Sequence, residues 1–502
     1  MKGSGTLRER WHRLADVQPE YLFLLFAIPF ALVFVLMLPP GAGMDEANHI
    51  SRTDQLAAGQ LTAYPVGVAE GLTGDSAVLY GGSVDKGLYE ATEECGNTFR
   101  NASRYSFPPW SSQNMGTEER LGQGSVEAVF SNTAVYSPLV YAPYVVGFWV
   151  ANLFSLNVYS AVMLMRLCGL LVYLATFFLA IRFIPFGKWA ILFIGLIPQV
   201  LIGSCCVSAD NMSNCAALFF IVCFMLLVCG DAQPSRRRWA VLLASCVALA
   251  LVKMTYFPLT LLLFFAPIWN KSLRHRRQMF IIGGIFIASA CVFLSWYLLI
   301  RTINTGAMWV SFLGRTIDPE SQKAAILERP LRFLYVLGTS ILNQGYFSFG
   351  MFGSIDYRRD YNSSGTFSVL LLVLVLVYFD RREHPGRGLS RRSGTFLLAS
   401  YGLFLMVTIA IYLALYLQFN TPGSSVIEGV QSRYFIPLLP LLLLPLALLS
   451  YRLQFRNGSA AEVDGSKALR TVRPTIFACI VAFLAIQELL AVNALAYALY
   501  LY

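Results

Sequence analysis

Uncharged apolar stretches long enough to cross a lipid bilayer recur from one end of this sequence to the other. A hydrocarbon core of about 30 Å needs roughly 20 apolar residues in helical conformation. Only 13% of the 502 residues are charged, against roughly 25% in an ordinary soluble domain. The stretches also lack the alternation of transmembrane β-strands. The sequence therefore predicts an all-α polytopic membrane protein.

Eleven apolar segments are candidate transmembrane helices. The first ends in Pro39 and Pro40 without a small-residue cleavage site, so we interpret it as an uncleaved anchor. Basic residues lie on both sides of the region 239–269, so we expect two short helices there, with Lys253 near the outer tip of the hairpin. The eleven segments are 21–39, 158–181, 189–204, 212–229, 239–252, 255–269, 279–300, 366–379, 395–418, 435–450 and 474–500.

The distribution of Lys and Arg predicts the orientation. With the N-terminus in the cytoplasm, the cytoplasmic tail 1–20 and the loops on its side, including 451–473, carry 23 basic residues. The opposite side carries 13 in far more sequence, so the positive-inside rule favours this orientation. The net charge of +10 is then a feature of membrane topology, and we expect no nucleic-acid partner. Everything from residue 21 to residue 502 belongs to one transmembrane domain.

Two external regions are too long to be simple connections. They are 40–157 and 301–365. The first ends in an aromatic, apolar stretch that reaches Leu156, which is typical of a helix lying on the outer leaflet. The second contains a similar candidate surface helix from Leu331 to Gly345. Contact with membrane lipids is expected along both.

The segment that follows the first span is the strongest candidate for chemistry. If residues 45–58 are helical, Asp45, His49 and Arg52 share one face and Glu46 lies a quarter turn away. Such a group offers a general base, or a set of oxygen and imidazole ligands for Mg²⁺ or Mn²⁺ from Asp45, Glu46 and His49. The alternative is that the two acidic residues only cap a helix.

Four further charged residues lie at membrane depth or at its outer edge, where charge is costly and marks paired or functional groups. Arg166 lies within the second span, and a buried ion pair is its structural alternative. Lys253 and Arg433 lie near the outer edge, where the alternative is snorkelling to lipid headgroups. Asp210 lies in a short external turn and could simply cap a helix. Walker, HExxH and GxSxG motifs are absent from the sequence, which argues against ATP-driven chemistry and serine hydrolysis.

Together these features resemble the GT-C superfamily of membrane glycosyltransferases, with large external loops that bear surface, jaw-type helices. Five short motifs in order resemble, more specifically, the bacterial family called domain of unknown function 2142. Two positions depart from the usual family pattern, Met44 in place of Pro and Ser432 in place of Gly. The motifs are Met44-Asp-Glu-Ala-Asn-His49, Tyr136-Ser-Pro-Leu-Val-Tyr-Ala-Pro143, Ser208-Ala-Asp210, Lys253-Met-Thr-Tyr-Phe-Pro258 and Gly429-Val-Gln-Ser-Arg-Tyr-Phe-Ile-Pro437.

The resemblance implies a hexosyl- or pentosyltransferase at the outer face of the bacterial cytoplasmic membrane. Its donor would be a polyprenyl-phosphate sugar and its acceptor a glycan, lipid or protein of the cell envelope. By position, Asp45 would be the catalytic base, and Glu46 and Asp210 would assist it or hold a metal. Lys253 and Arg433 would bind the donor phosphate, with Arg166 as a third candidate. The remaining support residues would be His49, Arg52 and Tyr434.

Two other functions remain open from the residues alone. A transporter or flippase of lipid-linked saccharides would also need basic residues near a lipid phosphate, but transporters usually show repeats and acidic residues in mid-membrane. Here Glu488 is the one acidic residue within a predicted span, and we find no repeat. A non-catalytic scaffold of envelope assembly would use the same external loops to bind a partner.

Overall fold

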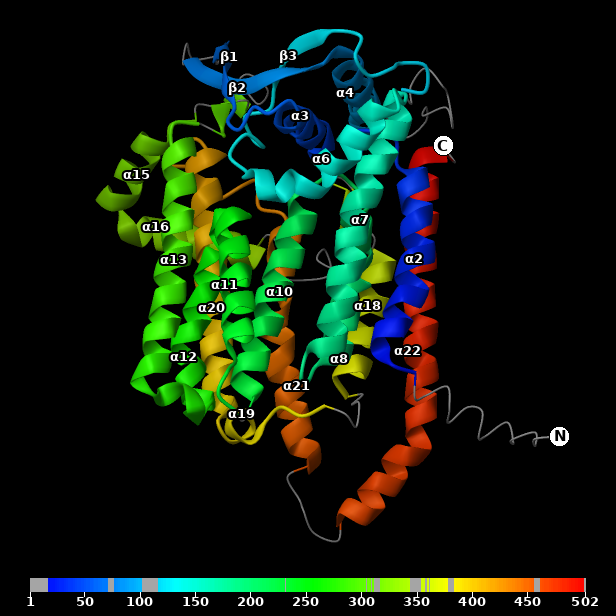
Figure 1. Ribbon diagram of the computed structural model, residues 1–502, viewed down its shortest axis with the longest axis vertical. Helices are drawn as coiled ribbons and strands as arrows, with labels where there is room; N and C mark the ends of the chain where they lie inside the picture. Colours follow the sequence, from blue (N-terminus) through cyan, green and yellow to red (C-terminus); the bar gives the residue numbers. More distant parts are fainter. Residues whose placement is uncertain are drawn as a thin grey trace, which may run out of the picture.

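A bundle of helices, covered at one end by a mixed layer of helices and strands, makes up the molecule (Figure 1). The computed structural model describes residues 17–70, 76–101, 116–230, 232–303, 305–307, 309–310, 317–343, 354–356, 359–360, 362–377, 383–455 and 461–500. The chain enters the bundle through α2 at the end opposite the layer, and α22 ends beside the layer.

Within the described residues, seven helical stretches are long and apolar enough to cross a membrane. This confirms a polytopic helical membrane protein. The helices are α2 (Pro19–Met37), α7 (Val158–Phe183), α10 (Ala209–Cys229), α13 (Arg276–Ile300), α20 (Ser393–Gln418), η3 (Ser432–Leu438) continued by α21 (Leu439–Phe455), and α22 (Ala461–Tyr500).

The other four predicted spans form helices that are shorter than a bilayer requires, so eleven full-length spans are not confirmed. Segment 189–204 breaks into two helices because Ile197 is extended and Pro198, which lacks an N–H, begins the second. Segments 239–252 and 255–269 form a short-helix pair with Lys253 between them, as expected. The helices are α8 (Lys188–Gly195), α9 (Pro198–Ser204), α11 (Arg236–Leu251), η1 (Met254–Leu261), α12 (Leu262–Trp269) and α18 (Asn362–Val377).

The layer at the end of the bundle comes mainly from the first long loop (Figure 1). Its helices are α3 (Glu46–Ala57), α4 (Lys86–Asn101) and α6 (Pro138–Leu153). It also contains a three-stranded antiparallel sheet that we did not predict, with β2 (Ser76–Asp85) between β1 (Tyr64–Glu70) and β3 (Ser125–Val129). Gln55 of α3 donates to the carbonyl of Gly81 in β2 at 3.2 Å, so the sheet lies against α3.

The second long loop contains α15 (Pro319–Glu328), α16 (Pro330–Asn343) and two short paired strands, β4 (Ser354–Asp356) and β5 (Arg359–Asp360). α16 occupies the predicted surface helix almost residue for residue. It buries Val336 and Leu337 and exposes Leu331 and Leu342, each by 80% or more. The remaining elements, η2 (Lys271–Arg274) and α19 (Arg387–Arg391), lie at the opposite end of the bundle.

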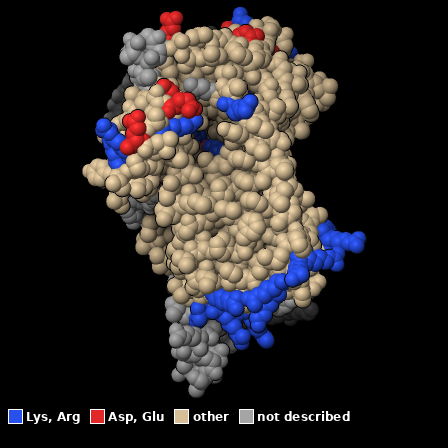
Figure 2. Space-filling model, turned by 90° about the vertical axis from the view of Figure 1, so that its left-hand side faces the viewer, with Lys and Arg blue, Asp and Glu red and all other residues tan. Residues whose placement is uncertain are grey.

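Charged side chains separate along the bundle axis. Figure 2 shows a band of Lys and Arg at the end away from the sheet, and on this face the Asp and Glu side chains gather near the other end. Arg236, Arg237 and Lys271 are exposed residues of the basic end. The asymmetry agrees with the grouping of basic residues on which the predicted orientation rests.

Candidate functional site

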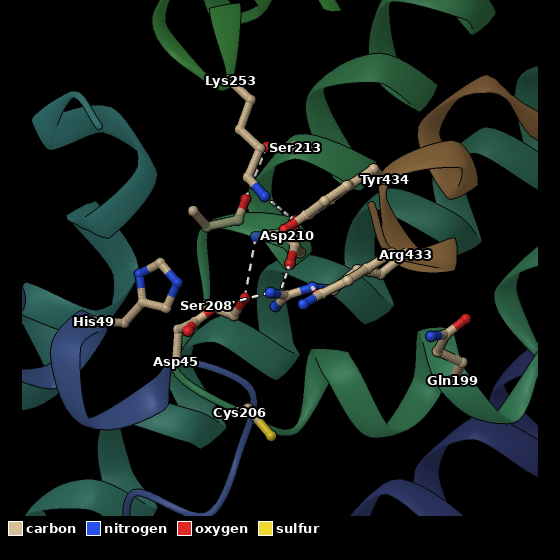
Figure 3. Close-up of polar contacts among 12 residues, drawn as sticks. Asp45, His49, Gln199, Cys206, Ser208, Asp210, Ser213, Lys253, Arg433 and Tyr434 are labelled. Atoms are coloured by element: carbon tan, nitrogen blue, oxygen red, sulfur yellow. Dashed lines mark hydrogen bonds and ion pairs between the residues drawn. The ribbon is translucent and has the colours of Figure 1, made fainter. Parts of the chain in front are cut away.

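Four charged side chains from distant parts of the chain meet where the bundle joins the layer (Figure 3). Asp45 precedes α3, Asp210 lies in the first turn of α10, Lys253 precedes η1, and Arg433 lies in η3. Arg433 bridges the two carboxylates, at 2.7 Å from Asp45 and 2.9 Å from Asp210. Lys253 donates to the second oxygen of Asp210. We call these four residues the ionic cluster.

The ionic cluster is shielded from solvent and electrically balanced. The side chain of Arg433 is 8% exposed, those of Asp210 and Lys253 are 12% exposed, and that of Asp45 is 24% exposed. Two positive charges face two negative ones, as low exposure requires, because an unpaired charge there would be strongly destabilising. Asp45 is therefore the carboxylate that an incoming molecule can reach most easily.

Asp45 has an unusual backbone conformation. Its φ is +56°, in the left-handed region, which costs a residue with a Cβ atom about 1 to 2 kcal/mol. It occupies the N-cap position of α3, yet its side chain makes no capping hydrogen bond. The capping alternative is therefore wrong for Asp45, whose carboxylate is directed to Arg433 instead.

Asp210 is not a helix cap either. The hydroxyl of Ser208 caps α10 by accepting the N–H of Asp210 at 3.1 Å. The carboxylate of Asp210 is then left for Lys253 and Arg433. Because it lies in the first turn, the helix dipole of α10 also stabilises its negative charge.

Two short 3₁₀ helices position the two cations of the ionic cluster. η1 begins directly after Lys253 and η3 contains Arg433, and each holds an internal proline, Pro258 or Pro437. The hydroxyl of Tyr256 in η1 donates to the carbonyl of Tyr434 in η3 at 2.9 Å, which joins the two elements. Because both cations are mostly buried and bound to carboxylates, the snorkelling alternative does not describe them.

Aromatic rings line the ionic cluster. The Lys253 ammonium lies 4.9 Å from the ring centroid of Tyr434 and 5.5 Å from that of Tyr136, distances typical of cation–π contacts. The His49 ring stacks on Tyr136 and bonds through Nδ1 to the hydroxyl of Tyr141 at 2.8 Å. Tyr136 and Tyr141 were not among our predicted site residues, although both lie in one of the sequence motifs.

The surroundings set the protonation states of Asp45 and His49. Burial by itself raises the pKa of the Asp45 carboxyl, but the charge and hydrogen bond of Arg433 outweigh it, so that pKa lies below its ordinary value. Burial lowers the pKa of His49 to about 4, against the opposing charges of Asp45 and Asp210. At neutral pH, Asp45 is thus a carboxylate and His49 an uncharged imidazole.

Three predicted site residues do not join the ionic cluster. Glu46 and Arg166, both fully buried, form an ion pair at 2.6 Å, which is the structural alternative that we gave for Arg166. Arg52 is buried as well and donates to Gln55 and to the carbonyl of Leu61 at 2.7 Å. The predicted shared face does not bring Arg52 to the ionic cluster, because its guanidinium is bound to Gln55 and to the carbonyl of Leu61.

Metal binding has no support in the part of the chain that the structure describes. No group of three or more His, Cys, Asp and Glu side chains lies there close enough to hold an ion. The predicted set of Asp45, Glu46 and His49 is divided, because Glu46 is bound to Arg166 and Asp45 to Arg433.

The fold and the site define a class: polytopic helical membrane proteins with a shielded ionic cluster at one end of the bundle. Within that class, the chain belongs to the family described as predicted membrane protein (DUF2142), whose model matches residues 28–442 and thus includes the whole ionic cluster. This confirms the predicted family. No curated protein and no solved structure matches the chain.

Proposed function

We propose that this protein is a GT-C-type glycosyltransferase that uses a polyprenyl-phosphate sugar at the outer face of the cytoplasmic membrane. Its acceptor would be a glycan, lipid or protein of the cell envelope. One observation carries the proposal: the most accessible carboxylate of the ionic cluster, Asp45, is held at 2.7 Å from a cation that is also bound to a second acid. A base and fixed positive charge therefore lie together, as displacement of a phosphate requires.

The chemistry follows from the positions of these groups. The acceptor hydroxyl attacks C1 of the donor sugar and transfers its proton to Asp45, while the bond between C1 and the phosphate oxygen breaks. The leaving prenyl phosphate keeps the bonding electrons, and its new negative charge is stabilised by Lys253 and Arg433. General-base catalysis of this kind contributes about 10² to 10⁴ in rate.

Charge balance couples donor binding to the base. The ionic cluster is neutral as it stands, so a donor phosphate must replace a carboxylate as the partner of Arg433 or Lys253. When the phosphate takes over Arg433, Asp45 loses the contact that holds its pKa low. Asp45 then becomes a stronger base at the moment when the donor is in place.

A flippase of lipid-linked saccharides is the second candidate, and one observation favours it. The break between α8 and α9 frees the carbonyls of Gly195 and Leu196, which accept hydrogen bonds from Tyr173 and Gln487. Beside Gln487, Glu488 is fully buried in α22. Broken helices and intramembrane acids are typical of transporters.

A reconstituted assay separates these functions. Purified protein in liposomes receives radiolabelled polyprenyl-phosphate hexoses and pentoses together with an extract of envelope acceptors. Transfer of label to an acceptor by the wild type, and its loss in Asp45→Asn, is the result expected of a glycosyltransferase. Movement of labelled lipid between leaflets without transfer would establish the flippase instead. If neither occurs, the scaffold function replaces both.

A further inference from the structure

The ion pair of Glu46 and Arg166 lies beside the ionic cluster but has no part in the proposed chemistry. We infer that these two are positioning residues, whose contacts fix the backbone that presents Asp45 and the turn that leads to Asp210. The inference rests on the proposed role of Asp45. Its test therefore includes a measurement that does not depend on sugar transfer.

Arg166 ties the end of α2 to the start of α3. Its Nε and Nη2 atoms donate to the two carboxylate oxygens of Glu46 at 2.8 and 2.6 Å. It also donates to the carbonyls of Leu38 and Pro39 at 2.6 and 2.8 Å. These carbonyls lie just after the last turn of α2, so no N–H group of a further helical turn is there to bind them. One side chain thus holds both ends of the short connection that contains Asp45.

Glu46 extends the same network to the second acid. Its Oε2 accepts the N–H of Gly43 and its Oε1 accepts the N–H of Val207, each at 2.9 Å. Gly43 lies two residues before Asp45, and Val207 directly precedes Ser208, the cap of α10. A single buried carboxylate therefore fixes both backbone segments that carry the acids of the ionic cluster.

The two segments also touch. A Cβ atom on Gly43 would lie 2.7 Å from Sγ of Cys206, so glycine is required for their close approach. Arg433 binds the acids of both segments, Asp45 at 2.7 Å and Asp210 at 2.9 Å. The left-handed conformation of Asp45 needs such support, because a strained backbone conformation persists only where several contacts of the surrounding structure hold it.

Hydrogen–deuterium exchange provides the test that is independent of activity. In Glu46→Gln and Arg166→Lys, we expect faster exchange in peptides covering 38–49 and 203–210, which lie more than 150 residues apart. Lysine lacks the forked guanidinium that binds several acceptors at once. Tyr173→Phe is the matched control: it removes a buried hydrogen bond, to the carbonyl of Gly195, on the same helix as Arg166. It should leave both peptides unchanged.

Sugar transfer provides the second measurement. Misplacement of a catalytic group by about 1 Å reduces the rate by about 100-fold, so we expect kcat to fall about 10- to 100-fold in both variants. The donor Kd should stay within about threefold, because Lys253 and Arg433 remain in place. If Glu46→Gln, which leaves the buried Arg166 without its counter-charge, does not fold, Arg166→Lys, which keeps the charge pair, carries the test alone.

The outcomes separate the two proposals. Unchanged exchange in both peptides, or faster exchange with wild-type kcat, would overturn the positioning role. Faster exchange in both peptides of a protein that transfers no sugar even as wild type would retain the positioning role and reject the proposed glycosyltransferase.

Discussion

Each charged group of the ionic cluster already has a partner, so a substrate of the proposed enzyme would have to exchange contacts with these groups. Arg433 is central to this exchange because it binds both acids. His49, uncharged at neutral pH, fixes the shape of the site through Tyr136 and Tyr141 and adds no charge. Substitutions that preserve shape and remove charge are therefore the most informative ones.

The role of Asp45 is tested by Asp45→Asn. The amide keeps the shape and tolerates the left-handed backbone, but it cannot accept a proton. We expect the transfer rate to fall by at least about 100-fold in a folded protein, measured with radiolabelled donor. Donor binding should be at least as tight as in the wild type, because the amide competes less than the carboxylate with the donor phosphate for Arg433. Glu320→Gln, on the exposed surface of α15, is the control. Full activity of Asp45→Asn would exclude this residue as the base.

The donor phosphate site is tested by Lys253→Met and, because Arg433 compensates two acids, by Arg433→Lys. Loss of one charge-assisted hydrogen bond to phosphate costs about 1.5 to 3 kcal/mol, so Lys253→Met should weaken donor binding roughly 10- to 150-fold. Arg433→Lys keeps the positive charge and loses only the bridging geometry, so it should weaken donor binding less than Lys253→Met does. Lys323→Met, at an exposed ion pair, should leave the affinity unchanged. Wild-type affinity in a folded Lys253→Met protein would argue for an ordinary structural ion pair.

Asp54 makes stability depend on pH. Its carboxylate is buried between α3 and β2 and accepts the N–H of Asp85 at 2.5 Å, and burial raises its pKa to about 6. Because the folded protein binds the proton more tightly than the unfolded chain, the contribution of Asp54 to stability falls as pH rises from about 4 to 6.

Asp54→Asn should remove that fall and raise stability at pH 7 by on the order of 2 kcal/mol, measured as the melting temperature in detergent between pH 4 and 7. In the control Asp318→Asn the fall should persist, because Asp54 is unchanged there. The pKa of Asp318 lies below its ordinary value, so Asp318 does not contribute to a fall of stability with rising pH. An Asp54→Asn protein with the wild-type pH profile would contradict the assignment.

At the scale of elements, hydropathy predicts the helices and says little about the layer above them. Segments 21–39 and 158–181 correspond closely to α2 and α7, because burial in lipid demands long apolar runs. The sheet was missed because Pro65 and Gly67 interrupt the alternation of β1. The acids and cations at the bundle end were predictable since charge is rare near lipid. The pairing of Glu46 with Arg166 was not, because the residues are separated by 120 positions and either could have bound other groups.

The sheet provides a prediction at this scale. A Cβ atom on Gly81 in β2 would lie 1.8 Å from the carbonyl oxygen of Ala128 in β3, so Gly81→Ala must separate the two strands. We expect a loss of about 1 to 3 kcal/mol, seen as a lower melting temperature and faster proteolysis of the layer. Gly67→Ala, in the same sheet, has its nearest neighbour at 3.9 Å and should be close to neutral. Equal stability of the two variants would contradict the strand register.

At the scale of the whole molecule, the basic band and the ionic cluster lie at opposite ends of the bundle. α7 has 26 residues, so it spans about 39 Å at 1.5 Å per residue. The direction in which the bundle is inserted therefore decides from which compartment a molecule can reach the ionic cluster. The positive-inside rule predicts that the ionic cluster faces the outside of the cell.

Labelling of one added, exposed cysteine at a time tests this direction. The side chains of Lys86 in the layer and Arg237 in the basic band are both exposed, so Lys86→Cys and Arg237→Cys are matched sites. The background replaces the exposed and partly exposed native thiols by serine, namely Cys168, Cys223, Cys229, Cys291 and Cys479. An impermeant maleimide should label Lys86→Cys in cells whose outer envelope is permeabilised, and Arg237→Cys only after lysis. The reverse pattern would place the ionic cluster in the cytoplasm.

The wide separation of the cluster residues along the chain also governs how the protein matures. Asp45 is synthesised 388 residues before Arg433, the cation that binds it, and η3 is among the last elements to be made. Until then Lys253 is the one cation of the ionic cluster that has been made, and the four-residue cluster is incomplete. A chain that ends before η3 therefore cannot form the ionic cluster, so under the proposed function only molecules whose membrane insertion is nearly complete would be active.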